Sequence, residues 1–253
     1  MSNLHVRHEL CVERGAKATC GSPSKPEHLA ESSQRLRELS GSLGRVKLIW
    51  DSVPKTVLIV HKYNDEGLYE IIEEFCDWLI QSGFTVYVED VLKLKMTARI
   101  ESKLNYWNAN FCCKHAEKID FVVSLGGDGT VLKSAWLFQE IVPPIFPFYF
   151  GSLGFLTGLE YGNYKKILSN MDSGLTVNIR MRLECILIRN GSTVEEMRCK
   201  VLNEIVLDRG PTSSMCTLDV YGDESLLTTV QADGVVIATP TGSTAYSVII
   251  IAY

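Results

Sequence analysis

The first candidate site in this sequence is the run Gly-Gly-Asp-Gly-Thr at residues 126–130. Glycine adopts backbone conformations with φ > 0 and lets a ligand come close, so Gly126, Gly127 and Gly129 predict a tight turn. We expect Thr130 to N-cap the helix that follows. A glycine turn that opens onto a helix N-terminus presents N–H groups and the positive end of the helix dipole. It therefore favours phosphate as a ligand.

Asp128 is the one charged residue of this turn. Beside bound phosphates, a carboxylate can hold Mg²⁺ or accept the proton of an attacking hydroxyl. In an ordinary β-turn, however, an aspartate only hydrogen-bonds to its own backbone, and Gly-Asp-Gly turns are common. Taken alone, the turn leaves a phosphate site and a plain turn as even alternatives.

Three further clusters lie in the second half of the chain. Asn203 and Glu204 interrupt an apolar run, so one of them faces the inner side of a sheet or a ligand. Buried polar groups need partners, which ribose hydroxyls or an adenine amine would supply, whereas a bulge or an exposed strand edge is the alternative. Asp233 lies in a second acidic glycine turn. Residues 239–246, Thr-Pro-Thr-Gly-Ser-Thr-Ala-Tyr, could wrap a ligand with hydroxyl and N–H donors, or form a turn.

Length, composition and charge limit the classes of protein to consider. The 253 residues suffice for two modest domains, and 46% hydrophobic with 22% charged residues predicts that most of the chain folds. A net charge of -5 argues against a nucleic-acid partner. The sequence contains neither the roughly 18-residue apolar run of a membrane helix nor the apolar core of a secretory signal. We expect a cytoplasmic protein with no membrane partner.

Cysteine and histidine spacing disfavours a structural metal site. The eight cysteines form no Cys-x-x-Cys pair and are expected to be reduced, partly buried thiols. The five histidines show no His-x-x-x-His spacing. Any metal is therefore expected to be Mg²⁺ that enters with a nucleotide.

The elements that must position these residues alternate between strand and helix in the first half of the chain. Apolar, β-branched runs predict strands over residues 55–60, 84–88, 121–125 and 145–150. Apolar spacing predicts an amphipathic helix over residues 67–82, a helical connector over 91–114 and a short helix over 164–171. This alternation predicts a parallel sheet with helices, and ligands in such sheets gather beyond the carboxyl ends of the strands.

In the second half, the hydrophobic period changes to two. Strands are expected over residues 175–181, 183–189, 197–208, 216–221 and 226–231, with turn signals between them. The predicted fold class is an α/β domain followed by an all-β, antiparallel, sandwich-like domain. We expect a mobile N-terminal extension at residues 1–54, an α/β nucleotide-binding domain at 55–157 and a β-rich domain at 158–253.

Taken together, these motifs resemble those of NAD kinases. Four segments follow the order and approximate spacing of that family, and the resemblance covers about residues 55–247; the segments are 126–130, 151–157 (Gly-Ser-Leu-Gly-Phe-Leu-Thr), 201–204 and 233–246. The resemblance implies ATP-dependent phosphorylation of the 2′-hydroxyl of the adenosine ribose of NAD, giving NADP. It also implies ATP and NAD as partners, Mg²⁺ as the cofactor that accompanies ATP, and a homo-oligomer.

The resemblance also assigns a role to each site residue. Asp128 is implied to be the catalytic, Mg²⁺-associated carboxylate. Gly126, Gly127 and Thr130 are implied to bind the phosphates of ATP. The residues implied to contact NAD are Gly129, Asn203, Glu204, Asp233, Thr244, Ala245 and Tyr246. Diacylglycerol-type lipid kinases have related glycine turns, but the segments 203–204 and 239–246 disfavour them.

The sequence departs from the family pattern after Ser247. Family members usually continue with a glycine-containing stretch and complete the β domain, whereas this sequence reads Val-Ile-Ile-Ile-Ala-Tyr. We therefore expect an incomplete β domain, an apolar segment prone to aggregation and little kinase activity. A non-catalytic, truncated NAD kinase product is the alternative to an active enzyme, and a lipid kinase relative is the third.

Overall fold

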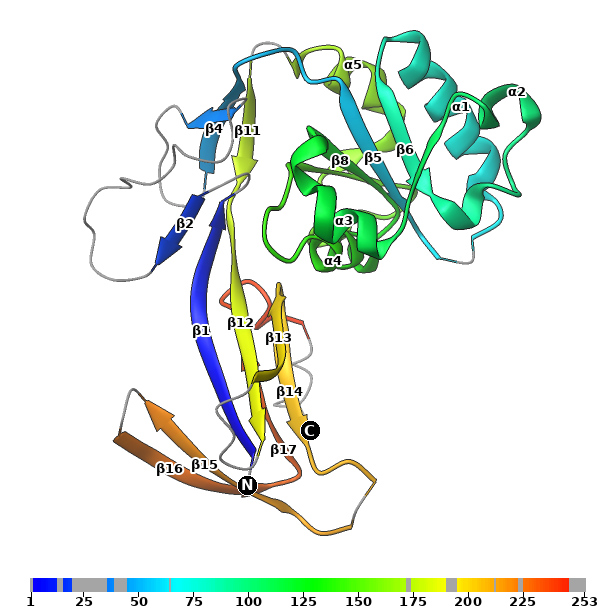
Figure 1. Cartoon of the computed structure of the whole chain (residues 1–253). Helices are drawn as coiled ribbons and strands as arrows, with labels where there is room; N and C mark the ends of the chain where they lie inside the picture. Colours follow the sequence, from blue (N-terminus) through cyan, green and yellow to red (C-terminus); the bar gives the residue numbers. More distant parts are fainter. Residues whose placement is uncertain are drawn as a thin grey trace. The chain divides into compact units, whose positions relative to one another are not determined.

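The computed structural model describes residues 2–12, 16–19, 36–38, 45–63, 65–171, 174–189, 195–211, 213–222 and 225–245. The chain divides into two compact units (Figure 1). The α/β unit is Glu9–Arg180, and the β unit is Met181–Tyr253 together with Met1–His8. No helix in the described ranges is both long and apolar enough to cross a membrane.

The α/β unit contains a six-stranded sheet with the order β10-β9-β8-β5-β6-β7, and all its neighbouring strands are parallel. Its strands are β5 (Thr56–His61), β6 (Thr85–Glu89), β7 (Asn105–Trp107), β8 (Phe121–Leu125), β9 (Ile145–Tyr149) and β10 (Leu159–Glu160). The predicted parallel sheet is therefore confirmed.

The helices of this unit are α1 (Leu68–Gln81), α2 (Ala98–Glu101), α3 (Ala109–His115), α4 (Asp128–Leu137) and α5 (Tyr164–Leu168). Single 3₁₀ turns occur at η1 (Asp90–Leu92), η2 (Ala116–Lys118) and η3 (Tyr161–Asn163). The prediction of one helical connector over residues 91–114 was wrong, because β7 lies within it. Trp107 holds this edge strand in place: its ring is buried and its Nε1 donates to Ile59 O at 3.0 Å.

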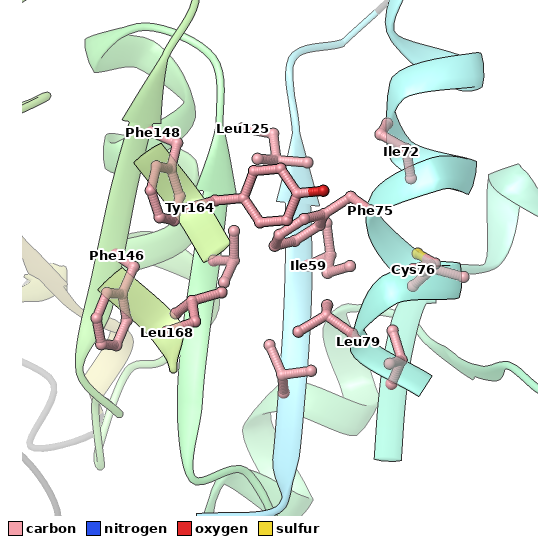
Figure 2. Packing of buried hydrophobic residues seen from close by; sticks show 14 of the residues in the cluster. Ile59, Ile72, Phe75, Cys76, Leu79, Leu125, Phe146, Phe148, Tyr164 and Leu168 are labelled. Carbon is pink, nitrogen blue, oxygen red and sulfur yellow. The ribbon is translucent and has the colours of Figure 1, made fainter. Parts of the chain in front are cut away.

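Helices cover both faces of the sheet, so alternate residues of one strand enter different cores. Ile59 of β5 packs in the core that contains Phe75 of α1 and Tyr164 of α5 (Figure 2). Its neighbour Leu58 packs on the opposite face, in the core that contains Leu137 of α4. All five residues of β8 are buried for the same reason. This two-sided packing fixes the strand that leads into the glycine turn.

A second, antiparallel sheet of this unit has the order β11-β4-β3. Its strands are β3 (Leu36–Glu38), β4 (Arg45–Trp50) and β11 (Leu175–Asn178). In β4, Leu48 is only 2% exposed and Trp50 only 8%. The stretch interpreted as an N-terminal extension thus contributes a strand with buried side chains, and it also contains β1 (Ser2–Val12) and β2 (Ala16–Thr19). The limits of the three predicted domains stay a prediction.

The β unit consists of antiparallel pairs, which confirms the predicted pairing. Its strands are β12 (Arg180–Arg189), β13 (Glu195–Val201), β14 (Glu204–Asp208), β15 (Cys216–Gly222), β16 (Ser225–Ala232) and β17 (Gly234–Ala238). The pairs are β12 with β13, β14 with β17, and β15 with β16. The prediction of one strand over residues 197–208 was wrong. The chain changes partner at Leu202 and Asn203, because β13 pairs with β12 whereas β14 pairs with β17.

The burial of Leu48 predicts that β4 contributes to the stability of the core. Leu48→Ala should lower the free energy of unfolding by about 2–5 kcal/mol, because it removes buried methyl groups and leaves a cavity. Val53→Ala is the matched control, since Val53 is 62% exposed and its replacement should change stability by less than about 0.5 kcal/mol. Urea unfolding measures both variants. Equal, small effects would show that β4 does not contribute to the core.

Candidate functional site

The glycine turn follows β8 at the carboxyl edge of the parallel sheet. Gly126 has φ 151°, a conformation that side chains rarely adopt. Its N–H donates to Phe148 O of β9 at 3.0 Å, and a methyl group there would press against Lys62 Cβ at 3.1 Å and collide with the Thr130 hydroxyl. A methyl group added at Gly127 or Gly129 would meet no atom within 4 Å, so both glycines border open space. The turn is therefore closed on one side and open on the other.

The helix after the turn begins earlier than the sequence predicted. Helix α4 starts at Asp128 with Gly127 as its N-cap, so the prediction that Thr130 caps it was wrong. The Thr130 N–H donates to Gly127 O at 2.9 Å, and its side chain is buried. Thr130 thus lies inside the first turn and packs against Gly126. The first N–H groups of an α-helix lack acceptors within the helix, so the start of α4 suits an anion.

Asp128 is held by a second loop of the same unit. Its Oδ2 accepts the Phe155 N–H and its Oδ1 accepts the Leu156 N–H, both at 2.8 Å. The Thr157 hydroxyl lies 3.4 Å from Oδ1. A carboxylate that accepts two backbone N–H groups has one orientation, and its position in the first turn of α4 is favourable in the helix dipole. Oδ1 thus accepts two donors, whereas Oδ2 still has a further lone pair for a ligand.

Gly154 and Thr157 are site residues that the sequence reasoning did not assign. A methyl group on Gly154 would collide with the Asp128 carboxylate and lie 2.6 Å from Thr157 Oγ1. Thr157 is buried, and its hydroxyl accepts the Gly154 N–H at 2.9 Å. The available signal was the segment 151–157, which the resemblance included without a role for any of its residues.

A charged cluster next to the turn was also not predicted. Lys133 of α4 donates to both carboxylate oxygens of Glu89, at 2.8 and 3.0 Å. His61, opposite Leu125 in the sheet, is 3% exposed, and its Nδ1 lies 3.7 Å from Glu89 Oε2. Burial lowers the pKa of His61, opposed by Glu89 and assisted by Lys133. The imidazole is therefore kept neutral at neutral pH.

In the β unit, Asn203 and Glu204 lie together with the loop of small hydroxyl residues. Thr239 is fully buried; its N–H donates to Asn203 O at 2.8 Å and its hydroxyl donates to Leu202 O at 2.8 Å. The hydroxyl also accepts the Gly242 N–H at 2.9 Å. A methyl group on Gly242 would collide with the backbone of Asn203. The loop is thus packed directly on the strand break at Asn203.

Glu204 carries an unpartnered polar atom in this cluster. Glu204 lies opposite Ala238 in the antiparallel pair of β14 with β17. Among the described side chains, Glu204 Oε2 is one of a few buried oxygen and nitrogen atoms with no hydrogen-bond partner. Burial raises the pKa of Glu204. A buried acceptor without a donor costs stability, so this atom is suited to a donor brought by a ligand.

The remaining predicted residues do not all lie in this cluster. Thr244 and Ala245 belong to the same loop: the Thr244 hydroxyl donates to Thr241 O at 3.3 Å and the Ala245 N–H to Gly242 O at 2.9 Å. Tyr246 lies outside the described residues. Asp233 precedes the other end of β17, where Gly234 faces Asp208.

At about 3.3 Å per strand residue, Asp233 is roughly 15 Å from Glu204. Its exposed carboxylate accepts from Arg209 Nε at 2.7 Å. The structure therefore does not bring Asp233 together with Asn203 and Glu204.

A dedicated metal cage does not occur in the described part of the chain, where no three His, Cys, Asp or Glu side chains converge. Asp128 is a single carboxylate beside open space. Mg²⁺ commonly uses one or two carboxylates and completes its shell with water and substrate phosphates. The donor set at the turn therefore fits Mg²⁺ only as a companion of a bound nucleotide.

A glycine turn at the carboxyl edge of a covered parallel sheet is typical of α/β proteins that bind nucleotides. The sequence matches the ATP-NAD kinase N-terminal domain over residues 57–174 and the ATP-NAD kinase C-terminal domain over residues 202–249. The chain belongs to the ATP-NAD kinase family.

Individual relatives agree with this assignment. The chain is 35% identical over 243 residues to ATP-NADH kinase YEF1 of Saccharomyces cerevisiae, covering 86% of this chain and 49% of that protein. It is 36% identical over 259 residues to NAD(+) kinase of the same yeast, covering 92% and 48%. It thus spans about half the length of these relatives. A solved yeast NADH kinase, in complex with NADH, matches with a TM-score of 0.74 at 30% identity, covering 87% of this chain and 67% of that one.

The pKa direction of Glu204 predicts a stabilising substitution. Because burial raises the folded-state pKa, the native state binds a proton more readily than the unfolded state, and stability falls as pH rises through that interval. Glu204→Gln should therefore raise the free energy of unfolding at neutral pH. The gain should shrink as the pH approaches the ordinary carboxyl pKa.

Urea unfolding at a neutral and an acidic pH measures the difference. Asp219→Asn, on the β15–β16 hairpin, is the control for loss of a negative charge. A Glu204→Gln variant that is less stable at neutral pH would show that the ionised carboxylate is satisfied within the folded chain.

Proposed function

We propose that this chain carries the catalytic parts of an NAD kinase, which transfers the γ-phosphate of ATP to the 2′-hydroxyl of the adenosine ribose of NAD and gives NADP. Membership of the ATP-NAD kinase family supports the reaction class. The observation that carries the proposal is the fixed Asp128 carboxylate beside the open glycine turn. A phosphate site and a base for a hydroxyl are the two parts that this transfer requires.

Asp128 is the proposed base. Phosphoryl transfer to a hydroxyl requires that the hydroxyl loses its proton, and an oriented carboxylate in hydrogen-bond reach accepts it. The N–H groups of Phe155 and Leu156 fix both oxygens of Asp128, so the remaining lone pair of Oδ2 has a set direction. Gly126, Gly127, Gly129 and Thr130 form the proposed phosphate turn, with Gly129 also next to the acceptor. The N–H groups of Gly127 and Gly129 would bind phosphate oxygens, since the start of a helix favours negative charge. Those of Gly126 and Thr130 already donate to Phe148 O and Gly127 O and shape the turn.

Mg²⁺ is proposed to accompany ATP. When bound, it would neutralise negative charge on the phosphates during transfer. Asp128 is the residue of this turn that could hold it. The same carboxylate therefore combines metal contact and proton acceptance in the proposal.

The cluster at Asn203 and Glu204 is the proposed site for the dinucleotide. Ribose hydroxyls and the adenine amine are donors, and the unpartnered Glu204 Oε2 is a buried acceptor. Thr244 and Ala245 lie in the loop packed on Asn203 and are proposed as further contacts. Tyr246 and Asp233 stay predictions from the resemblance. Yeast relatives named for NAD⁺ and for NADH leave both redox forms as acceptors to be assayed.

Location and assembly belong to the same proposal. The six cysteines whose side chains are described are free thiols, which supports a reducing, cytoplasmic compartment. The homo-oligomer remains an expectation from the resemblance. The alternative of a non-catalytic product is decided by assay: a folded sample that makes no NADP or NADPH from NAD or NADH with ATP would support it.

Substitution of the proposed base is the first test. Asp128→Asn should lower the rate of NADP formation about 10²–10⁴-fold, because an amide cannot accept the ribose proton. One Asn oxygen also cannot accept both N–H groups, so the variant loosens the Phe155–Leu156 loop as well. A coupled assay specific for NADP measures turnover, and calorimetry measures NAD binding.

The control is Asp219→Asn, which should keep normal turnover. Turnover by Asp128→Asn within a few-fold of the parent chain would exclude Asp128 as the base. NAD binding that is retained while turnover falls separates a chemical role from general damage.

Asn203→Ala tests the dinucleotide site. Loss of a neutral hydrogen bond costs about 0.5–1.5 kcal/mol, which corresponds to roughly a threefold to tenfold weaker affinity. We expect this loss for NAD and not for ATP, measured by calorimetry for each nucleotide. Gln231→Ala in β16 is the matched control and should leave both affinities unchanged. Equal losses for both nucleotides would favour the structural alternative, in which Asn203 only breaks the strand.

A further inference from the structure

Two cysteines face each other in the β unit. In the antiparallel pair of β12 with β13, Cys185 lies directly opposite Cys199. The flanking pairs on the same face are Leu183 with Val201 and Leu187 with Met197, and the register is unbroken until a shift after Leu187. The two thiols are therefore neighbours by the pairing of the strands, and both are free.

Ion pairing on the other face of the ladder fixes this register. Glu184 faces Lys200, and Arg198 Nη1 donates diagonally to Glu184 Oε1 at 3.0 Å. A slip of one strand by one residue would place Glu184 and Arg198 on opposite faces of the ladder. The facing of Cys185 and Cys199 is thus a property of the whole ladder.

The spacing of such a pair is compatible with a disulfide. Residues directly opposite in an antiparallel pair have Cα atoms about 4.5 or 5.5 Å apart, and disulfides span Cα separations of about 4.4–6.8 Å. The thiols of Cys185 and Cys199 already share a hydrogen bond. No rearrangement of the strands is needed for a bond to form between them.

The other four cysteines whose side chains are described offer no comparable pair. Cys112 and Cys113 are adjacent, but they lie in helix α3, where successive side chains point about 100° apart. Cys76 is buried in the core of the α/β unit, and Cys216 Sγ donates to Ala232 O at 3.1 Å. Among the six cysteines whose side chains the structure describes, Cys185 and Cys199 are the pair that faces across a ladder.

We propose that Cys185 and Cys199 are a reversible oxidation site, which forms a cross-strand disulfide by exchange with a low-molecular-weight disulfide such as oxidised glutathione. In the first step, the deprotonated Cys199 sulfur attacks one glutathione sulfur; a mixed disulfide forms and one glutathione thiol leaves. In the second, the deprotonated Cys185 sulfur attacks the Cys199 sulfur of the mixed disulfide, and the second glutathione thiol leaves. Two protein thiols are oxidised, and one glutathione disulfide is reduced to two thiols.

Exposure sets this order of attack. Cys185 is 3% exposed, whereas Cys199 is partly exposed and lies next to the exposed Met197 on its face. Burial, followed by the charge of Cys199 and the hydrogen bond to it, raises the pKa of Cys185 to about 11. The two contributions from Cys199 disappear once that sulfur is part of a mixed disulfide. Cys199 is therefore the entry point, and Cys185 resolves the adduct.

Peptide mapping of the full chain tests the site directly. The reduced protein is equilibrated in glutathione buffers from fully reduced to fully oxidised, its free thiols are alkylated, and it is digested with trypsin. Cleavage after Arg182, Arg189, Arg198 and Lys200 releases residues 183–189 and 199–200 as separate peptides. We expect these two peptides to become disulfide-linked as the oxidised fraction rises, with loss of most alkylated Cys185, and dithiothreitol to reverse the link.

Two variants serve as controls. Cys199→Ser should abolish the linked peptide and leave Cys185 alkylated, whereas Cys216→Ser should keep the link. A stable glutathione adduct on Cys199, or Cys185 that stays alkylated in fully oxidised buffer, would overturn the proposal. Mapping of the unsubstituted chain gives this answer even if a variant does not fold.

Discussion

The site of the α/β unit depends on one interaction, the pair of hydrogen bonds from the Phe155 and Leu156 N–H groups to the Asp128 carboxylate. These residues are nearly thirty positions apart in the sequence. They meet because β8 and β9 are parallel neighbours, so the segments after both strands emerge at the same edge of the sheet. The buried Thr157 and the side-chain-free Gly154 complete the contact. A flexible turn residue thereby becomes an oriented carboxylate beside open space.

In the β unit, too, hydrogen bonds fix a loop on a distant segment, but the central group is an uncharged hydroxyl. The buried Thr239 hydroxyl joins Leu202 to Gly242 and so fixes the loop of small residues on the strand break. In the neighbouring residue Glu204, the buried Oε2 has no hydrogen-bond partner within the part of the chain that the structure describes. Such an atom lowers stability in the free protein and is retained where a ligand supplies the donor. A buried acceptor that lowers the stability of the folded chain thus supports the proposed dinucleotide site.

Much of this could be predicted from local patterns. Apolar β-branched runs revealed the central strands, because strands covered on both faces bury every residue, and the glycines revealed the turn. Long-range contacts were not predictable. Gly154 and its loop received no role because their partner is a distant carboxylate. Thr130 was expected to cap the helix because the actual N-cap, Gly127, has no side chain. The break at Asn203 depends on which strands pair. The cluster of His61, Glu89 and Lys133, in which only His61 is buried, has no recognisable spacing in the sequence.

The central claim is that fixing Asp128 from the second loop is required for turnover, and Gly154→Ala tests it most directly. The new methyl group would displace the carboxylate, whereas Gly158→Ala, four residues on, has no atom within 4 Å to meet. The measurement is the rate of NADP formation by both variants, with NAD affinity measured in parallel. Misplacement of a catalytic group by about 1 Å can cost roughly a hundredfold in rate, so the account predicts a loss of that order for Gly154→Ala, a normal rate for Gly158→Ala and unchanged NAD affinity. Equal, near-normal rates in both variants would contradict it.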